Sequence, residues 1–384
     1  MAVDLENPSP FYRQVIEDLR AQVNSGQLKA GDQIPSQREL AQRYGVSSIT
    51  IKRALTELIS EGLLLSRAGK GTFVAQPKRA ITYSDRALIG LVLRDLRDPF
   101  FSLIVHSVQG KAADLGYNIL LSNTSNLAEE EESQVTRFRQ LGVSGLIIAS
   151  MSYVHRATDV IKSLQREKFP LVMVSYVEDE DISYIGTDHR YGAFIATEHL
   201  ISLGYKKIGY ISGEEGNVLG DLRGEGYRQA LERHGLPVDE SLVYQLLYNG
   251  EWNHYQSGYE IGQLVVKQPD RPDAIFAYND LSALGFEQGI LANGLRIPED
   301  VAIVGFDDIE RDLHAPVPLT TVHQPTTLIG HLAVETLIDK VNGDHSVIRT
   351  FLKPRLVVRE SCGGVPTSAC LGAPEESPTT AVAS

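Results

Sequence analysis

Cysteine is scarce in this 384-residue chain, and metal-binding patterns are missing. The two cysteines, Cys362 and Cys370, both lie near the C-terminus. We therefore expect neither a disulfide framework nor a cysteine metal site in the fold. The ten histidines are scattered, and pairs such as His189 and His199 lack the i, i+4 spacing of helical metal ligands. The sequence predicts no metal and no other cofactor.

Long apolar runs are missing as well. Residues 145–149 (GLIIA) and 171–174 (LVMV) are among the longest, and they fall far short of the roughly 20 residues that span a bilayer. The first residues, MAVDLENPSPFYRQ, carry acids and prolines where a secretory signal would have a basic and then an apolar segment. A hydrophobic share of 42% with 22% charged residues still indicates a packed core. We expect a cytoplasmic protein with no membrane span.

Common signatures of nucleotide-binding and hydrolytic enzymes are absent. No G-x-G-x-x-G follows a predicted strand, and no G-x-S-x-G occurs. Residues 69–72 (GKGT) lack the full phosphate-loop frame and a following helix. We therefore expect no catalytic residues and no enzyme. A sugar-modifying enzyme with a regulatory front is the alternative, but it would need a nucleophile with its base or a phosphate loop.

Charge is distributed unevenly along the chain. The first 79 residues carry eleven Lys and Arg against eight Asp and Glu, whereas the rest carries 25 against 41. A polyanion would be repelled by the acidic part and tolerated by the basic part. A nucleic-acid partner is thus expected at the front of the chain.

The front of the chain has the pattern of a helix-turn-helix followed by a hairpin. Apolar residues at helical spacing predict a first helix over residues 12–23, and Ser36 with Glu39 forms an S-x-x-E capping box that opens a second one. A third helix is predicted over residues 47–62 and a hairpin over residues 63–75. On the face of the third helix opposite its apolar stripe lie short polar and basic side chains, as a DNA-recognition helix requires. These are Ser47, Ser48, Thr50, Lys52 and Arg53.

From Ala87 onward, apolar strands alternate with helical segments. The predicted strands include residues 88–93, 117–121, 145–149, 171–174, 207–212, 274–278 and 301–306. Repeated βα units predict an α/β domain with parallel sheets and helices on both faces. Periodicity alone leaves open whether the strands form one wide sheet or two lobes.

Polar side chains follow two of these strands. Asn279 and Asp280 come after residues 274–278, and Asp307 and Asp308 come after residues 301–306. Open α/β sheets bind ligands at the carboxyl ends of their strands. Amides and carboxylates pair with vicinal hydroxyls, and the single tryptophan, Trp252, could stack on a sugar ring. Taken singly, Trp252 could equally be a core residue, and Asp308 is interpreted as a helix cap.

Residues 361–384 are rich in Ser, Thr, Ala, Pro and Gly. With almost no large apolar residue, such a segment cannot bury enough surface to order itself. It is predicted to be a disordered tail.

The front resembles the winged helix-turn-helix domain of the GntR family of bacterial transcription regulators, through residues 28–74 and the helix before them. The resemblance implies that Ser36 and Arg38 contact phosphates or a base edge. It also implies that residues on the third helix read the major groove and that residues of the hairpin approach the minor groove. The former are Thr50, Lys52 and Arg53, and the latter are Lys70 and Gly71. Gln37 departs from the acidic residue that the family often carries there.

Residues 87–360 resemble the effector domain of the LacI/GalR repressors, which is related to periplasmic sugar-binding proteins. The matching stretches include residues 98–121, 192–213, 273–285 and 297–309. The resemblance implies two lobes joined by three strands, a ligand cleft between them and dimerisation. Effector-contacting positions match Arg223, Trp252, Asn279, Asp307 and Gln324, the first-lobe wall matches Phe100 and Phe101, and Asp98 and Ser175 lie near such positions.

Together these observations predict a homodimeric transcription factor that binds operator DNA and a small-molecule effector, which we expect to be a sugar. We expect a repressor of carbohydrate-utilisation genes, although an activator or a purine-responsive regulator would use the same fold. A transport-associated sugar receptor is opposed by the DNA-binding front. The expected organisation is a winged helix-turn-helix over residues 1–77, a linker over 78–87, a two-lobed domain over 88–360 and the tail over 361–384.

Overall fold

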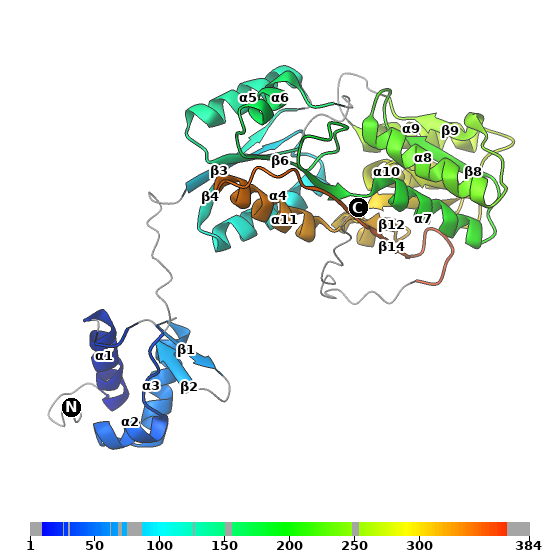
Figure 1. The fold of residues 1–384 in the computed structure, drawn as a ribbon. Coiled ribbons are helices and arrows are strands. Elements are labelled where there is room, and N and C mark those ends of the chain that lie inside the picture. Colours follow the sequence, from blue (N-terminus) through cyan, green and yellow to red (C-terminus); the bar gives the residue numbers. More distant parts are fainter. Residues whose placement is uncertain are drawn as a thin grey trace. The chain divides into compact units, whose positions relative to one another are not determined.

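The computed structural model describes residues 10–25, 27–29, 31–61, 63–67, 71–74, 87–125, 127–149, 156–247 and 253–366. Lys70, Trp252, residues 78–86 of the expected linker and residues 367–384 of the expected tail lie outside this part. The chain divides into two compact units, Met1–Arg86 and Ala87–Ser384 (Figure 1).

The first unit contains three helices and one hairpin in its described part, as the sequence predicts. They are α1 (Phe11–Asn24), α2 (Gln37–Tyr44), α3 (Ser48–Ser60), β1 (Leu64–Arg67) and β2 (Gly71–Val74), the two strands pairing antiparallel. The capping box is confirmed: Ser36 Oγ accepts from the Glu39 amide, and Glu39 Oε2 accepts from the Ser36 amide at 2.7 Å. Gly45 ends α2 at a φ of 69°, where a side chain would be strained. The helices enclose a small apolar core that includes Leu19, Leu40, Ile51 and Leu58.

The second unit contains two lobes, which resolves the choice that periodicity leaves open. The sheet of lobe 1 is fully parallel, in the order β13-β7-β6-β5-β3-β4. Its elements are β3 (Ala87–Leu93), α4 (Pro99–Asp114), β4 (Tyr117–Asn123), α5 (Ala128–Gln140), β5 (Gly145–Ile148), α6 (Asp159–Arg166), β6 (Leu171–Met173), β7 (Tyr184–Thr187), α11 (Thr326–Val341) and β13 (Arg349–Leu352). Helices α4 and α11 cover one face of this sheet, and helices α5 and α6 cover the other (Figure 1). Apolar residues of these helices pack against the sheet.

Lobe 2 repeats this arrangement around a sheet in the order β14-β12-β11-β10-β8-β9, in which only β14 runs antiparallel to its neighbour. Its elements are α7 (His189–Ser202), β8 (Ile208–Ser212), α8 (Val218–Arg233), η1 (Glu240–Leu242), β9 (Val243–Gln245), α9 (His254–Val266), β10 (Ala274–Ala277), α10 (Asp280–Leu291), β11 (Ala302–Asp307), η2 (Glu310–His314), β12 (Thr320–His323) and β14 (Arg355–Val357). Apolar residues of α9 and α10 pack on one face and those of α7 on the other.

The chain passes between the lobes three times: from β7 to α7, from β12 to α11 and from β13 to β14. Each lobe is therefore built from segments that are far apart in the sequence. In a doubly wound sheet the carboxyl ends of the strands form the edge that binds ligands. In this unit those edges carry Arg94 after β3 and Asp307 at the end of β11.

The prediction that the disordered tail begins at residue 361 is wrong. Ser361 and Cys362 are fully buried. The Ser361 carbonyl accepts from the Ile303 amide at 2.9 Å, and the Ser361 hydroxyl donates to the Ile303 carbonyl at 2.7 Å. Composition missed this because a serine and a cysteine can be held by backbone hydrogen bonds without large apolar side chains. The packed domain thus continues to at least Gly364.

Candidate functional site

The candidate DNA-binding face of the first unit lies on the exposed side of α2 and α3. Arg38 and Lys52 are exposed. Arg53 is also exposed, but its guanidinium lies 3.9 Å from the centre of the Tyr12 ring on α1. That contact holds Arg53 against the body of the unit. Arg38 and Lys52 are therefore better placed than Arg53 to reach a phosphate or a base.

The short polar side chains at the start of α3 bond to one another. Ser47 Oγ accepts from the Thr50 amide at 3.2 Å and lies 2.8 Å from Thr50 Oγ1. These bonds satisfy an orphan amide at the helix start and hold Thr50 half-buried. Ser48 remains exposed, and the Ser36 hydroxyl is engaged by Glu39.

The described end of the hairpin shows why a glycine stands there. Gly71 has a φ of 108°, and a Cβ at this position would lie 2.6 Å from Gln33 Nε2. Any other residue would be strained and would displace Gln33.

Sequence reasoning also missed Ile49 on α3, whose side chain is 80% exposed. The sequence could have indicated this exposure, because Ile49 lies on the face of the helix opposite Ile51, Leu55 and Leu58.

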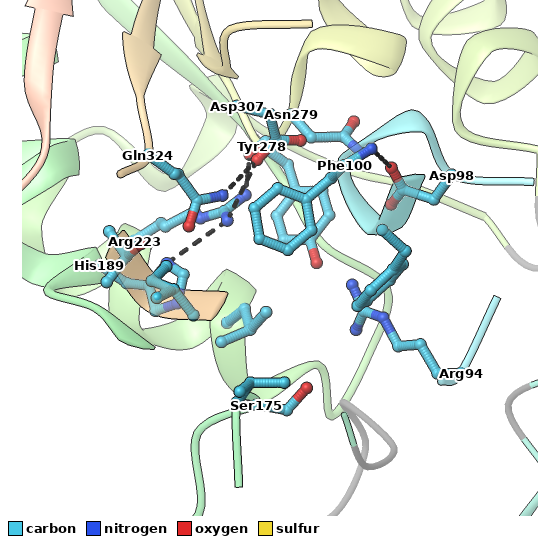
Figure 2. A pocket seen from close by; sticks show the side chains of 15 residues that line it. Arg94, Asp98, Phe100, Ser175, His189, Arg223, Tyr278, Asn279, Asp307 and Gln324 are labelled. Atoms are coloured by element: carbon cyan, nitrogen blue, oxygen red, sulfur yellow. Dashed lines mark hydrogen bonds and ion pairs between the residues drawn. The ribbon is translucent and has the colours of Figure 1, made fainter. Parts of the chain in front are cut away.

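The candidate effector site is a pocket between the two lobes of the second unit (Figure 2). Its lining residues come from both lobes. Eight of the nine expected positions line it: Asp98, Phe100, Phe101, Ser175, Arg223, Asn279, Asp307 and Gln324. The ninth, Trp252, lies outside the described residues. Sequence reasoning missed Arg94, Val174, Thr187, His189, Leu219, Tyr278 and Ile329.

Buried polar groups form the lobe 2 wall of the pocket. Gln324 Nε2 donates to Asp307 Oδ1 at 2.6 Å, and the Arg223 guanidinium lies 3.7 Å from the same oxygen. Arg223 also donates to the Tyr278 carbonyl and stacks 3.8 Å from the centre of the Phe306 ring. Burial raises the pKa of Asp307 well above its ordinary value, while the positive charge of Arg223 acts in the opposite direction. The wall therefore offers a fixed cluster of donors and acceptors.

His189 adds a neutral group to this wall. Burial and the neighbouring charges of Arg223 and Arg94 hold its pKa well below the ordinary value. Its Nδ1 lies 3.4 Å from Arg223 Nη2, which can only donate, so the neutral ring carries its proton on Nε2. His189 could have been suspected only because it lies two residues after the end of strand β7.

Asn279 is oriented by a chain of hydrogen bonds. Its Oδ1 accepts from the Ser282 amide at 3.0 Å as the N-cap of α10, and its Nδ2 lies 2.8 Å from His254 Nδ1. His254 Nε2 in turn lies 2.8 Å from Glu214 Oε1. Burial works to raise the pKa of Glu214, but the interaction with His254 and the hydrogen bonds from its own backbone and from Asn217 together outweigh it and lower this pKa to about 2. The ionised Glu214 thus fixes the His254 tautomer, and His254 fixes the Asn279 amide.

On the lobe 1 side, Asp98 caps α4 by accepting from the Phe100 amide at 3.0 Å. The Phe100 and Phe101 rings meet edge to face, with centres 5.3 Å apart. Phe101 is buried in the lobe core, whereas Phe100 is half-buried and lines the pocket. The aromatic surface on this side therefore faces the polar wall of lobe 2 (Figure 2).

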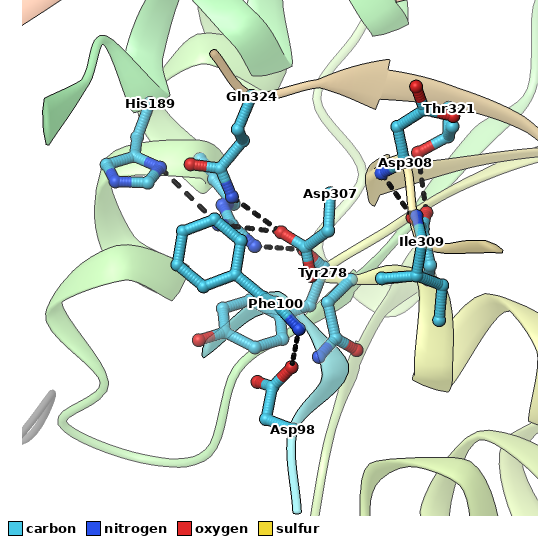
Figure 3. Close-up of polar contacts among 12 residues, drawn as sticks. Asp98, Phe100, His189, Tyr278, Asp307, Asp308, Ile309, Thr321 and Gln324 are labelled. Atoms are coloured by element: carbon cyan, nitrogen blue, oxygen red, sulfur yellow. Dashed lines mark hydrogen bonds and ion pairs between the residues drawn. The ribbon is translucent and has the colours of Figure 1, made fainter. Parts of the chain in front are cut away.

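The backbone that presents Asp307 is strained. Asp307 and Asp308 have φ values of 130° and 62°, which non-glycine residues rarely adopt. The Asp280 carboxylate holds this turn: Oδ2 accepts from the Asp308 amide at 2.6 Å and from the Ile309 amide at 3.2 Å. Its Oδ1 accepts from Thr321 Oγ1 at 2.6 Å (Figure 3).

Asp308 is not the helix cap that was expected, because Ile309 precedes η2. Its carboxylate instead accepts from His323 Nδ1 at 2.8 Å and from Arg359 Nη2 at 2.5 Å. The left-handed backbone turns Asp308 away from the helix start and toward β12 and the C-terminal segment. Asp308 is therefore a structural partner of the strained turn.

Two absences hold for the part of the chain that the structure describes. No cluster of three His, Cys, Asp or Glu side chains there could hold a metal ion. Nor does that part contain a helix with the length and apolar character needed to cross a bilayer.

Comparisons with known proteins agree with both units. Residues 11–74 match the family described as bacterial regulatory proteins, gntR family, and residues 197–362 match the periplasmic binding protein-like domain. The arabinose metabolism transcriptional repressor of Geobacillus stearothermophilus is 31% identical over 366 residues, covering 93% of this chain and 98% of that protein. The HTH-type transcriptional repressor PurR of Haemophilus influenzae (strain PittEE) is 29% identical over 335 residues, covering 84% and 97%.

One solved structure is also similar to this chain. The LacI family transcriptional regulator of Enterococcus faecium with bound ribose is 26% identical, with a TM-score of 0.62 over 71% of this chain and 98% of that one. The chain therefore belongs to the bacterial transcriptional repressors that join a GntR-type winged helix-turn-helix to a periplasmic-binding-protein-like effector domain of the LacI type.

Proposed function

We propose that this chain is a cytoplasmic, homodimeric repressor of carbohydrate-utilisation genes that a small sugar releases from its operator. The pocket between the lobes carries the proposal. Its lobe 2 wall places Arg223, Asp307 and Gln324 within bonding distance of one another, opposite Phe100 of lobe 1.

This combination suits a neutral, polyhydroxylated ligand. Each sugar hydroxyl both donates and accepts, so it pairs with an acceptor such as Asp307 and a donor such as Arg223. The ring's C–H face packs on an aromatic surface, for which Phe100 is available. Charges of both signs line the pocket, Arg94 and Arg223 against Asp98 and Asp307, so its composition does not select a strongly charged ligand. The ribose held by the Enterococcus faecium relative supports a ligand of this class.

Release from DNA follows from where the ligand binds. A sugar that contacts both lobes stabilises the arrangement in which they are closed, and three chain crossings carry that change through the unit. In a dimer, a shift between lobes alters the spacing of the two DNA-binding units. Operator affinity then falls, provided that the DNA-bound arrangement has the weaker affinity for sugar.

Arg38 and Lys52 are the proposed phosphate or base contacts in the first unit. Ser36, Ser47 and Thr50 act mainly by fixing the starts of α2 and α3, since their hydroxyls are engaged locally. Arg53 supports the recognition helix through Tyr12. Lys70 and Gly71 are proposed to bring the hairpin to the minor groove.

A thermal-shift screen tests the function. Pentoses, hexoses, disaccharides, polyols and purines would each be added at millimolar concentration, and a ligand at 100 times its Kd raises stability by about 2.7 kcal/mol. We expect one sugar class to shift the melting temperature and to release the chain from DNA selected by the chain itself, measured by mobility shift. A purine that does both, with no response to any sugar, would contradict the carbohydrate assignment.

A further inference from the structure

Ile49 is the most exposed large apolar side chain in the described part of the first unit. It is 80% exposed, compared with 42% for Phe11, the other large apolar side chain exposed there. It lies in the first turn of α3, and nothing in its local structure requires isoleucine. A β-branched residue is also a poorer helix former than alanine at an exposed position.

The surroundings of Ile49 point to a polyanion rather than to another apolar surface. On a helix, residues three, four and seven positions apart share one face. Lys52, Arg53 and Thr56 therefore extend in one row from Ile49, and these residues, together with Glu57, line a shallow hollow with it. Ile51, Leu55 and Leu58 are buried on the opposite face.

The major groove of DNA offers one apolar feature to such a face. Among the base edges exposed there, only thymine carries a methyl group, at C5. The N-terminal residues of a recognition helix are those that reach base edges. Ile49 lies there, between Ser48 and Thr50, which have short side chains, so its branched side chain projects beyond theirs.

We propose that Ile49 selects a thymine in each operator half-site by covering its C5-methyl group, while Lys52 anchors the helix on the phosphate backbone. The inference rests on the proposed repressor function and names one element of its sequence preference. Removing the methyl from one half-site should weaken binding about fourfold, as expected for one buried carbon. Removing it from both half-sites should weaken binding about 15-fold.

Deoxyuridine gives a direct test, because it differs from thymidine only by this methyl group. The full-length chain would first select a duplex from a random pool. Each thymine of that duplex would then be replaced in turn by deoxyuridine, and Kd would be measured by fluorescence anisotropy at fixed salt. The variants are Ile49→Ala and, as a matched control that truncates an exposed apolar side chain on α1, Phe11→Ala. Ile49→Ala should fold normally, because the side chain is exposed and alanine favours helix.

The proposal expects one thymine per half-site at which the parent and Phe11→Ala lose about fourfold on substitution. Because Ile49→Ala removes the contact from both half-sites, the variant should bind the unmodified duplex about as weakly as the parent binds the duplex substituted in both half-sites, and should lose nothing further at those positions. If no deoxyuridine position affects the parent, or if Ile49→Ala keeps the same sensitivity, the assignment of Ile49 is wrong although the repressor function stands. If the parent selects no DNA at all, the proposed function fails and this inference fails with it.

Discussion

Asp307 combines backbone strain with a position facing the ligand. Its φ of 130° is tolerated because Asp280 holds the following amides, and its carboxylate joins Gln324 and Arg223 at the pocket wall. A residue held in this way is pre-organised, so a ligand pays little to order it.

Asp307→Asn keeps the shape of the side chain but replaces one acceptor oxygen by a donor. We expect sugar affinity to fall about 5- to 150-fold, the equivalent of about 1 to 3 kcal/mol, because a ligand hydroxyl loses its partner in a closed pocket. Operator affinity should stay at the parent value, so the variant would resist release. Titration calorimetry and mobility shift measure the two quantities. Glu310→Gln, an exposed carboxylate three residues away, is the control. Equal sugar affinity in both variants would remove Asp307 from the site.

Glu287 is a buried carboxylate outside the pocket that makes stability depend on pH. Burial raises its pKa to about 7, although the Val317 amide donates to it at 2.9 Å. Between its ordinary value of 4.5 and about 7, the unfolded chain releases a proton that the folded chain keeps. This group therefore lowers the free energy of unfolding as pH rises.

Glu287→Gln removes this titration and keeps an acceptor for the Val317 amide. From pH 5 to pH 8 the parent should lose about 2 kcal/mol of unfolding free energy relative to the variant. Urea denaturation at both pH values measures the difference. An identical pH dependence in parent and variant would show that Glu287 is already ionised at pH 5.

At the residue scale, the sequence predicted Asp307 and Asn279 in the pocket but missed Tyr278 and His189. Asp307 and Asn279 follow strands and matched known positions. Tyr278 and His189 also follow strands, but a tyrosine or histidine there is as common in a core as in a site. Only the fold shows that both side chains line the same pocket.

At the scale of elements, the turn from Asp307 to Ile309 depends on a pair of buried acids. Asp280 and Asp312 are both fully buried. Burial and then the negative charge of Asp280 raise the pKa of Asp312 to about 12. Asp312 therefore stays protonated, and Asp280 remains the acceptor for the turn.

Asp280→Asn should loosen this turn, because an amide nitrogen replaces one of the oxygens that accept from Thr321 or the backbone. We expect a loss of about 1 to 3 kcal/mol in unfolding free energy and weaker sugar binding, with operator affinity in the folded protein unchanged. Asp312→Asn is the matched control, since an amide can donate as the protonated acid does. Both variants would be compared by urea denaturation and calorimetry. If Asp312→Asn were the more damaging change for sugar binding, Asp280 would not be the residue that holds the turn.

The C-terminal segment is an element that composition could not reveal. Ser361 forms two hydrogen bonds with the Ile303 backbone of β11. Its hydroxyl also accepts from the Thr320 amide of β12 at 2.8 Å. Ending the chain after Glu360 would leave these buried groups without partners. We expect a loss of about 3 kcal/mol or more. Ending it after Pro366 should leave stability unchanged, and thermal unfolding distinguishes the two. Similar melting temperatures for both truncations would contradict the role of Ser361.

Most helices and strands could be predicted because their signals are local. The capping box of α2 is formed by Ser36 and Glu39, and the apolar residues of α3 recur every three or four positions, so each signal lies within a few residues. The three crossings between lobes could not be predicted from periodicity, because a helix such as α11 follows β12 of one lobe and packs in the other. The two-lobed arrangement came only from the family resemblance.

At the scale of the whole molecule, the proposed DNA-binding site and the proposed sugar-binding site lie in separate compact units. Any influence of one site on the other must then pass through a shared change of arrangement. The first 79 residues are mildly basic and the remainder is strongly acidic, so DNA should contact the first unit alone. A sugar can release DNA only by binding one arrangement of the protein more tightly than the other.

Thermodynamic linkage makes this coupling testable in both directions. If saturating sugar weakens operator binding by a given factor, saturating operator must weaken sugar binding by the same factor, for which we expect about 5- to 150-fold. Calorimetry with and without operator gives one factor, and anisotropy with and without sugar gives the other. Residues 87–366 alone, which lack the DNA-binding unit, should bind sugar equally well with or without operator. A scrambled duplex should leave the sugar affinity of the full chain unchanged, because non-specific contacts do not select one arrangement. Factors near one in both directions would show that sugar binding and operator binding are not coupled, and the release mechanism proposed for the pocket would then have to be abandoned.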